Sequence, residues 1–156
     1  MRAVCDTSPF IALNSVGQLS LLPQLLDTIT VPAAVAAELK SVLLPDWVRV
    51  VSIPVVSIPQ GAIPHVREAR LGRGETEAIH LALHLRPDRL LLDDREGRRE
   101  AQRLGPRVTG VLGLLVAAKR IGLLPAVRPD VARLRTSGFR VSEGLYKELL
   151  ASCGEI

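Results

Sequence analysis

The sequence predicts an α/β fold in which a parallel sheet is covered by helices on both faces. Short apolar or β-branched segments alternate along the chain with segments of helical periodicity, and this alternation is typical of such sheets. The 156 residues suit one domain of ordinary size. We therefore expect a single domain over residues 1–156, built as a three-layer α/β/α sandwich around a mainly parallel sheet.

Five segments have the composition of buried strands. The first is an apolar run that ends at Cys5, and Asp6 follows it directly. The second is β-branched, and the fourth places three consecutive leucines before Asp93. Apolar and β-branched runs bounded by polar or turn residues favour strands. The predicted strands cover residues 2–5, 28–31, 47–51, 89–93 and 107–109.

Eight segments between or after the strands are predicted helices. Pro32 stands at a favourable first helical position, Gly138 is an expected left-handed cap, and Ser142 is a standard N-cap for the last helix. The segment 41–63 contains several prolines and Gly61, which predict irregular structure over much of it. The predicted helices cover residues 10–13, 19–26, 33–40, 75–85, 95–104, 111–120, 129–136 and 143–150.

The charge and composition indicate which partners and which cellular location suit this protein. A net charge of +4 and a sequence pI of about 9.7 are compatible with a polyanionic partner, and equally with an arginine-rich composition that has no such meaning. Aromatic residues make up only 3%, which argues against a binder that stacks bases on exposed rings. The absence of a disulfide framework, a signal-peptide pattern and long apolar stretches predicts a cytoplasmic protein without membrane spans.

Asp6 places a carboxylate at the carboxyl end of the first predicted strand. Open α/β sheets build their sites at this edge. Asp, Thr and Ser before a proline are also ordinary helix caps, so the local pattern leaves both capping and metal binding open for Asp6. Ser8 is a candidate for capping the next helix and for a hydrogen bond in the site.

Asp93 and Asp94 follow the three leucines and form the second strand ending of this kind. One of them can cap helix 95–104, and the other then needs a different role. Adjacent carboxylates repel each other, and a cation between them and Asp6 would relieve that repulsion.

Helical spacing separates the acidic residues of segment 75–85. Glu75 shares a stripe with small residues that permit close packing, whereas Glu77 shares a polar stripe with His80 and His84 and is expected to face water. The two histidines have a spacing that can hold zinc, but no Cys or third His stands at a matching distance. Glu38 lies on an alanine-rich helix and is, by itself, an ordinary solvated residue.

The densest basic segment of the chain is predicted to lie beside Asp93 and Asp94. This segment is either a helix face exposed to water or a surface that contacts phosphate groups. Arginine favours the second interpretation, because its guanidinium fork suits phosphate oxygens. The segment contains Arg95, Arg98, Arg99, Arg103 and Arg107.

Taken together, these residues resemble the PIN domain, the small α/β nuclease module, and in particular the PIN-like toxins of prokaryotic toxin–antitoxin pairs. The resemblance runs over almost the whole chain, and the ordered set of motifs is more specific than any one of them. The matching stretches are VCDTSPFIAL (4–13), VPAAV (31–35) with Glu38, LGRGETEAI (71–79), LLDDR (91–95) with Arg98, GVLG (110–113) and GFRVS (138–142).

The resemblance implies a nuclease that cuts single-stranded RNA with Mg²⁺ or Mn²⁺, together with a cognate antitoxin and a homodimeric state. Its acidic cluster falls on Asp6, Glu38, Glu75 and the pair Asp93–Asp94. Glu75 stands where many PIN nucleases carry Asp, so this ligand is one methylene longer. Hard carboxylate oxygens suit such ions.

The expected site has two parts. Asp6 and Asp94 are assigned as direct metal ligands, with Glu75, Glu38 and Asp93 binding through water or orienting it. Which of the two adjacent aspartates faces the metal stays open. The substrate-binding residues are Ser8, Arg95, Arg98 and Arg99.

Three other functions are alternatives to the nuclease. A response-regulator receiver needs an acidic pair at its first strand, where this chain has Cys5 before Asp6. A phosphatase of the haloacid dehalogenase type needs a second Asp where Ser8 stands. The stronger rival is a PIN fold with a weakened site that binds RNA or protein without cutting.

Overall fold

The computed structural model describes residues 1–52 and 72–156, and these form the predicted α/β fold around one sheet. Within the described residues the sheet has five strands, all parallel, in the order β3-β2-β1-β4-β5. The strands are β1 (Arg2–Cys5), β2 (Thr28–Pro32), β3 (Val48–Val51), β4 (Arg89–Leu91) and β5 (Val108–Thr109).

The helices lie close to their predicted positions. Ser142 accepts a hydrogen bond from the Leu145 amide at 3.1 Å, and Gly138 has a φ of 97°, so both predicted caps are confirmed. In these parts of the chain, no helix is long and apolar enough to span a bilayer. The helices are α1 (Thr7–Ser15), α2 (Leu21–Leu25), α3 (Ala33–Leu43), α5 (Arg73–Leu85), α6 (Arg95–Leu104), α7 (Val111–Arg120), α8 (Arg128–Thr136) and α9 (Glu143–Ser152).

Several boundaries differ from the prediction, among them the start of α1, which lies at Thr7 rather than at residue 10. The sequence pattern ends a helix at residue 40, but α3 continues to Leu43, so the irregular segment predicted from residue 41 begins later. Strand β4 ends at Leu91 rather than at residue 93, which leaves both following aspartates in the turn. The remainder of the predicted irregular segment, from residue 53, lies outside the described residues.

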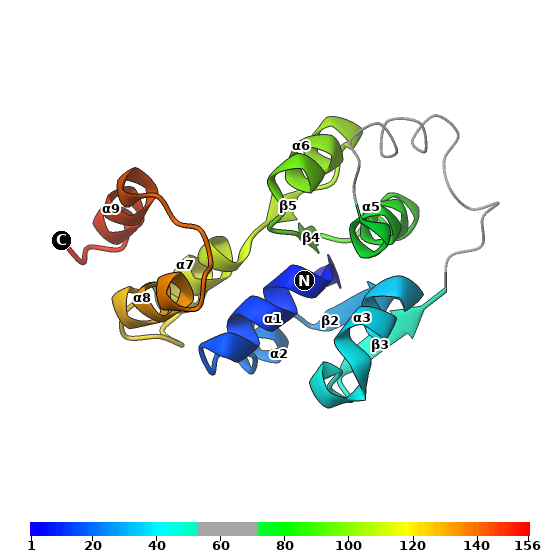
Figure 1. The fold of residues 1–156 in the computed structure, drawn as a ribbon, viewed down its shortest axis with the longest axis horizontal. Helices are drawn as coiled ribbons and strands as arrows, with labels where there is room; N and C mark the ends of the chain where they lie inside the picture. Colours follow the sequence, from blue (N-terminus) through cyan, green and yellow to red (C-terminus); the bar gives the residue numbers. More distant parts are fainter. Residues whose placement is uncertain (53–71) are drawn as a thin grey trace.

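Side chains of the strands alternate between two apolar cores, as a sheet covered on both faces requires. Ala3, Cys5 and Leu91 pack on one face with α1, α2 and the C-terminal helices. Val4 and Leu90 pack on the other face against α5 and α6. Figure 1 shows the resulting layers, with α9 and the pair α3–β3 at opposite ends of the molecule.

The strand order creates a switch point between β1 and β4. From β1 the chain builds the sheet outward through β2 and β3, and it then returns to add β4 on the other side. Cys5 pairs with Leu91, and the Asp6 amide donates to the Leu91 carbonyl at 3.0 Å. The carboxyl ends of these two strands therefore meet, which is where α/β sheets place their ligands.

The prediction that the Glu77 side chain faces water is wrong. One of its carboxylate oxygens accepts a hydrogen bond from the Ala34 amide at 3.2 Å, and the other accepts one from Arg73 Nε at 3.0 Å. Ala34 belongs to the first turn of α3, whose amides have no intrahelical partner. Glu77 therefore ties α5 to the N-terminus of α3.

We expect the variant Glu77→Ala to lower the free energy of unfolding by about 1–2 kcal/mol, because it leaves the α3 amide without its acceptor and removes a negative charge from a helix N-terminus. The matched control is Glu100→Ala, which removes only an ion pair with Arg103 on the same helix and should cost less than about 0.5 kcal/mol. Urea unfolding of the two variants measures the difference, and equal losses would contradict the assigned role.

Candidate active site

Asp6 is the most deeply buried acid at the switch point. It occupies the N-cap position of α1 in an extended conformation, yet its carboxylate makes no capping hydrogen bond. The residue is 2% exposed, and among the described residues its Oδ1 atom has no hydrogen-bond partner. Since a buried polar atom without a partner is costly, the capping interpretation does not account for this carboxylate.

Asp94 and Asp93 each accept a hydrogen bond from the start of a different helix. Asp94 Oδ2 accepts a hydrogen bond from the Gly97 amide at 2.8 Å and caps α6, so one of the pair is a cap, as predicted. Asp93 Oδ1 accepts one from the Val111 amide at 3.0 Å, at the first residue of α7. The other oxygen of Asp93 is buried and has no partner within residues 1–52 and 72–156.

Glu38 lies at this site, although its side chain remains exposed to solvent. The Thr7 hydroxyl donates to Glu38 Oε2 at 2.5 Å. A Cβ atom on Gly74 would stand 2.6 Å from Glu38 Oε1, so glycine in the first turn of α5 makes room for this carboxylate. Thr7 is a site residue that the sequence did not single out, although its place directly after Asp6 was a usable signal.

Glu75 stands in the first turn of α5 and is half-buried, as its stripe of small residues indicated. Its pKa is raised, first by burial and then by the negative charge of Asp94, while the Gly72 amide acts in the opposite direction and Glu38 adds a smaller increase. These shifts place Glu75, Glu38 and Asp94 within electrostatic reach of one another. With Asp6 they form the acidic cluster (Asp6, Glu38, Glu75 and Asp94).

Burial in the acidic cluster raises the pKa of Asp6 from 3.8 to about 7. Burial is the largest cause, the hydrogen bond from the Thr7 amide partly opposes it, and the charges of Glu75, Glu38 and Asp94 raise the pKa further. Burial and like charges both disfavour an ionised carboxylate. The cluster is therefore unfavourable as a set of bare anions, and a bound cation would stabilise it.

The donor set fits a hard divalent cation. Every member supplies carboxylate oxygen, the ligand that Mg²⁺ and Mn²⁺ prefer, and the partnerless Oδ1 of Asp6 is the most buried donor. In the described part of the chain, no three His, Cys, Asp or Glu side chains already stand close enough to hold an ion. Carboxylates from four segments thus meet here without forming a closed ligand shell.

Comparison with known families agrees with this arrangement. A family model described as a PIN domain (DUF3368) matches residues 2–155. The chain belongs to the PIN-domain family. A search of curated proteins finds no match. PIN domains are generally nucleases that use divalent metals, so the family supports a nuclease-type function for this chain.

The arginines of this PIN domain are split between its two edges. Arg95, Arg98 and Arg99 line a shallow depression on α6, and Arg98 is close enough to Asp93 to lower the pKa of that carboxyl, which burial raises overall. Arg103 instead pairs with Glu100. Arg107 precedes β5 and lies at the opposite edge of the sheet, so the predicted surface of five arginines is wrong for these last two.

The structure differs from two further predictions, which concern Ser8 and His80. Ser8 lies half-buried in the first turn of α1, but the helix has no side-chain cap. The sequence pattern places His80 on a polar stripe, but its side chain is 5% exposed. Burial lowers the pKa of His80, which favours the neutral imidazole.

We predict that the Asp6 carboxyl makes the metal-free protein less stable at high pH. Its pKa is higher in the folded protein than the usual 3.8, so the folded state holds the proton more tightly. This stabilisation is complete below pH 3.8 and is lost as the pH rises through about 7.

In EDTA, wild type should lose up to about 3 kcal/mol more than Asp6→Asn between pH 5 and pH 8, since one pKa unit corresponds to about 1.4 kcal/mol. Urea unfolding of both proteins at the two pH values measures this. Parallel pH dependence of wild type and variant would show that Asp6 titrates normally.

Gly110 allows Asp93 to hold α7. A Cβ atom there would stand 2.5 Å from Asp93 Oδ1 and would also meet the Arg98 guanidinium. We expect Gly110→Ala to destabilise the fold by about 1–3 kcal/mol, because it displaces the acceptor of the Val111 amide. The control Gly144→Ala has open space around the new Cβ and should stabilise α9 by up to about 1 kcal/mol. Thermal unfolding compares the two, and destabilisation by both would contradict this assignment.

Proposed function

We propose that this PIN domain is a metal-dependent endoribonuclease that hydrolyses phosphodiester bonds of single-stranded RNA. The observation that carries the proposal is the acidic cluster, in which a buried carboxylate with a partnerless oxygen lies among three further acids at the switch point. Such a cluster suits cation binding and the handling of a negatively charged phosphate.

The metal ligands in this proposal are Asp6, Glu75 and Asp94, and the ion is Mg²⁺ or Mn²⁺. Asp94 is preferred over Asp93 because its charge acts on both Asp6 and Glu75, whereas Asp93 is engaged by the Val111 amide and faces Arg98. When bound, a divalent ion lowers the pKa of a water molecule and neutralises charge on the reacting phosphate.

The remaining catalytic residues act on water and on the cluster itself. Glu38 is the exposed member of the cluster, and it is therefore the carboxylate best placed to accept a proton from an attacking water. The Thr7 hydroxyl orients Glu38 by donating to one of its oxygens. Asp93 keeps the start of α7 against the site.

The RNA-binding residues in this proposal are Ser8 and the arginines Arg95, Arg98 and Arg99. The three arginines line the depression on α6, the helix that Asp94 caps. Guanidinium groups bind phosphate oxygens through paired hydrogen bonds. They would hold the RNA backbone without reading its sequence.

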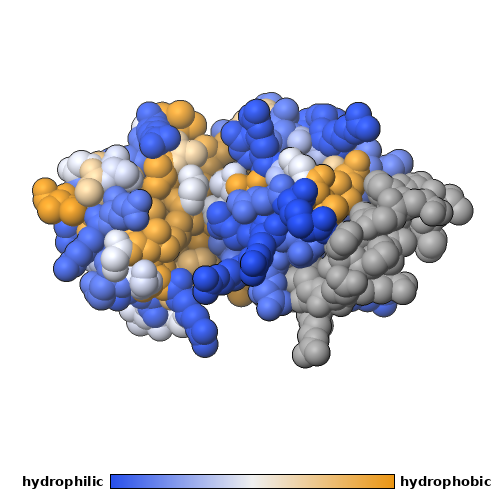
Figure 2. Space-filling model, turned by 90° about the horizontal axis from the view of Figure 1, so that it is seen from above, coloured by the Kyte–Doolittle hydropathy of each residue, from blue (hydrophilic) through white to orange (hydrophobic). Residues whose placement is uncertain are grey.

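We further propose that the protein is the toxin of a cytoplasmic toxin–antitoxin pair and acts as a homodimer. An apolar groove between β5, α7 and α9 supports a protein interface. It is lined by Leu112, Val116, Leu145 and Leu149 among others, and Figure 2 shows apolar surface gathered in a hollow between hydrophilic regions. An antitoxin gene beside the gene for this chain would support this assignment.

The deciding experiment incubates purified protein with labelled single-stranded RNAs in Mg²⁺, Mn²⁺ or EDTA. We expect metal-dependent cleavage, and a loss of at least about 100-fold in Asp6→Asn, because this change removes the central metal ligand. The variant Glu77→Gln, just outside the cluster on the same helix as Glu75, is the matched control and should retain activity.

Two results would redirect the assignment. Cleavage that survives in Asp6→Asn would contradict the proposed site. RNA binding in EDTA without cleavage under any metal would favour the rival function, a PIN fold that binds RNA or protein with a weakened site. Binding of Mg²⁺ or Mn²⁺, measured by the increase in melting temperature at pH 8 in wild type but not in Asp6→Asn, tests the metal site independently of activity.

A further inference from the structure

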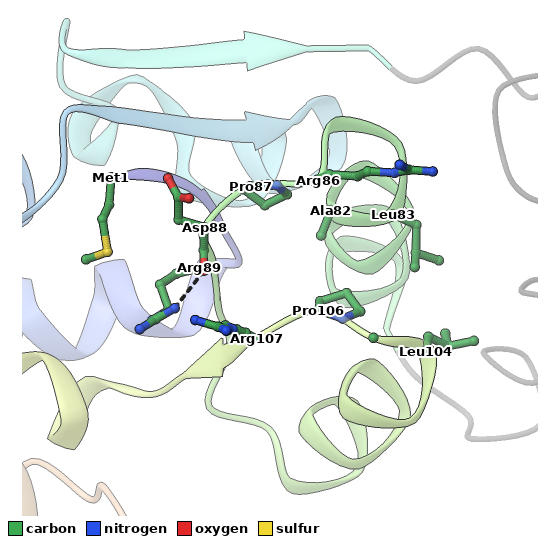
Figure 3. Close-up of a pocket in the computed structure, with 11 residues that line it drawn as sticks. Met1, Ala82, Leu83, Arg86, Pro87, Asp88, Arg89, Leu104, Pro106 and Arg107 are labelled. Carbon is green, nitrogen blue, oxygen red and sulfur yellow. Dashed lines mark hydrogen bonds between the residues drawn. The ribbon is translucent and has the colours of Figure 1, made fainter.

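A second cavity lies at the amino-terminal edge of the sheet, opposite the acidic cluster. Its volume is about 630 Å³, within the range of small-molecule sites. The cavity is bounded by the turn between α5 and β4 and by the turn between α6 and β5 (Figure 3). None of the acidic cluster residues lines it, so it is separate from the candidate active site.

Two arginines form the charged side of this cavity. The register that pairs Leu90 with Val108 places Arg89 beside Arg107 on adjacent parallel strands, and the Leu90 amide donates to the Arg107 carbonyl at 2.8 Å. Figure 3 shows the two side chains next to each other. Like charges on neighbouring strands repel each other, so this pair is unfavourable without an anion.

Asp88 is a carboxylate that lines the cavity, and its pKa is lowered first by the hydrogen bond from the Arg2 amide and also by the positive charge of Arg89. Neither Arg89 nor Arg107 takes part in any of the ion pairs formed within residues 1–52 and 72–156. Arg89 Nη1 donates to the Asp88 backbone carbonyl at 2.8 Å. The Asp88 carboxylate, on the rim, accepts a hydrogen bond from the Arg2 amide at 2.7 Å. The two guanidinium groups therefore keep donors available for a ligand.

The opposite side of the cavity is apolar. Ala82 and Leu83 come from the last turn of α5, Leu104 comes from the end of α6, and Pro87 and Pro106 come from the two turns. In Figure 3 these side chains stand across the cavity from the arginine pair. The cavity thus offers cationic donors at one side and apolar side chains at the other, with Arg86 beside them at the end of α5.

The α5–β4 turn that shapes this apolar wall is strained. Arg86 has a φ of 50° and a ψ of 59°, a left-handed conformation, and it is the one non-glycine residue with positive φ in the described ranges. Such a conformation is unfavourable for a residue with a Cβ. The Arg2 guanidinium supports it by donating to the Arg86 carbonyl at 2.9 Å. The turn holds Pro87 against the cavity.

We propose that this cavity binds a small phosphate monoester with an apolar or planar body, of the size of a nucleoside monophosphate. A phosphate monoester carries between one and two negative charges at neutral pH, which matches two adjacent guanidinium groups better than a single carboxylate does. Guanidinium forks also fit phosphate oxygens bidentately. A bare phosphate would leave the apolar wall uncovered, and an uncharged ligand would leave the arginines unpaired.

Calorimetric titration of the full chain with AMP, adenosine, inorganic phosphate and benzoate tests this assignment. EDTA is present throughout, so that no metal bridges a nucleotide to the acidic cluster. We expect AMP to bind at least about tenfold more tightly than the other three probes. The variant Arg107→Gln should weaken AMP binding by about tenfold or more, because it removes one guanidinium fork.

Two further variants separate this cavity from other sites. Leu83→Gln alters only the apolar wall, so it should weaken AMP binding and leave phosphate binding unchanged. Arg140→Gln makes the same charge change at an exposed position between α8 and α9 and should have no effect. Circular dichroism and thermal unfolding confirm that each variant is folded.

Several results would overturn the proposal. Unchanged AMP affinity in Arg107→Gln would exclude the cavity, and an equal loss in Arg140→Gln would indicate nonspecific attraction to positive charge. Loss of AMP binding in Arg95→Gln instead would place the nucleotide at the depression on α6. Binding of an RNA oligonucleotide that depends on Arg107, without binding of AMP, would make this edge a path for RNA rather than a small-molecule site.

Discussion

The burial of Asp6 among neighbouring carboxylates at the switch point is the constraint on which this site depends. Asp6 lies beneath the surface with one oxygen lacking a partner, and burial together with three further acids raises its pKa to about 7. Folding brings these groups together because the ends of β1 and β4 pair directly. Burial and mutual repulsion disfavour the ionised form of these carboxylates. Their grouping is therefore better explained as a cation-binding site than as a source of stability.

Residues at the starts of several helices contact the acids and fix their positions. Thr7 and Gly74 fit around Glu38, the Gly97 amide fixes Asp94, and the Val111 amide fixes Asp93. Helix N-termini thus gather at the carboxyl edge of the sheet, where their partial positive charge offsets part of the repulsion. This compensation explains how one small domain tolerates so many acids in one place.

The two edges of the sheet have opposite electrostatic character. Acids collect where strands end, whereas Arg89 and Arg107 stand side by side where β4 and β5 begin. Both groupings place like charges in neighbouring positions, and a ligand of the opposite sign would relieve the repulsion in each. The sheet therefore separates a region suited to cations from a region suited to anions.

Local patterns were sufficient for the fold class, the five strands, most helix boundaries and two of the caps, because these depend on periodicity and on residues close in sequence. The same patterns indicated Asp6, Glu75 and the pair Asp93–Asp94 as candidates, and the resemblance to PIN domains added Glu38.

Local patterns could not decide which side chains folding would bury or bring together. The sequence pattern places His80 and Glu77 on a polar stripe, yet His80 is buried and Glu77 accepts a hydrogen bond from the amide of Ala34. The contact of Thr7 with Glu38, the division of labour between Asp93 and Asp94, and the pairing of Arg89 with Arg107 all join residues from different elements. Such contacts are set by strand order and register, which are properties of the assembled sheet rather than of any one segment.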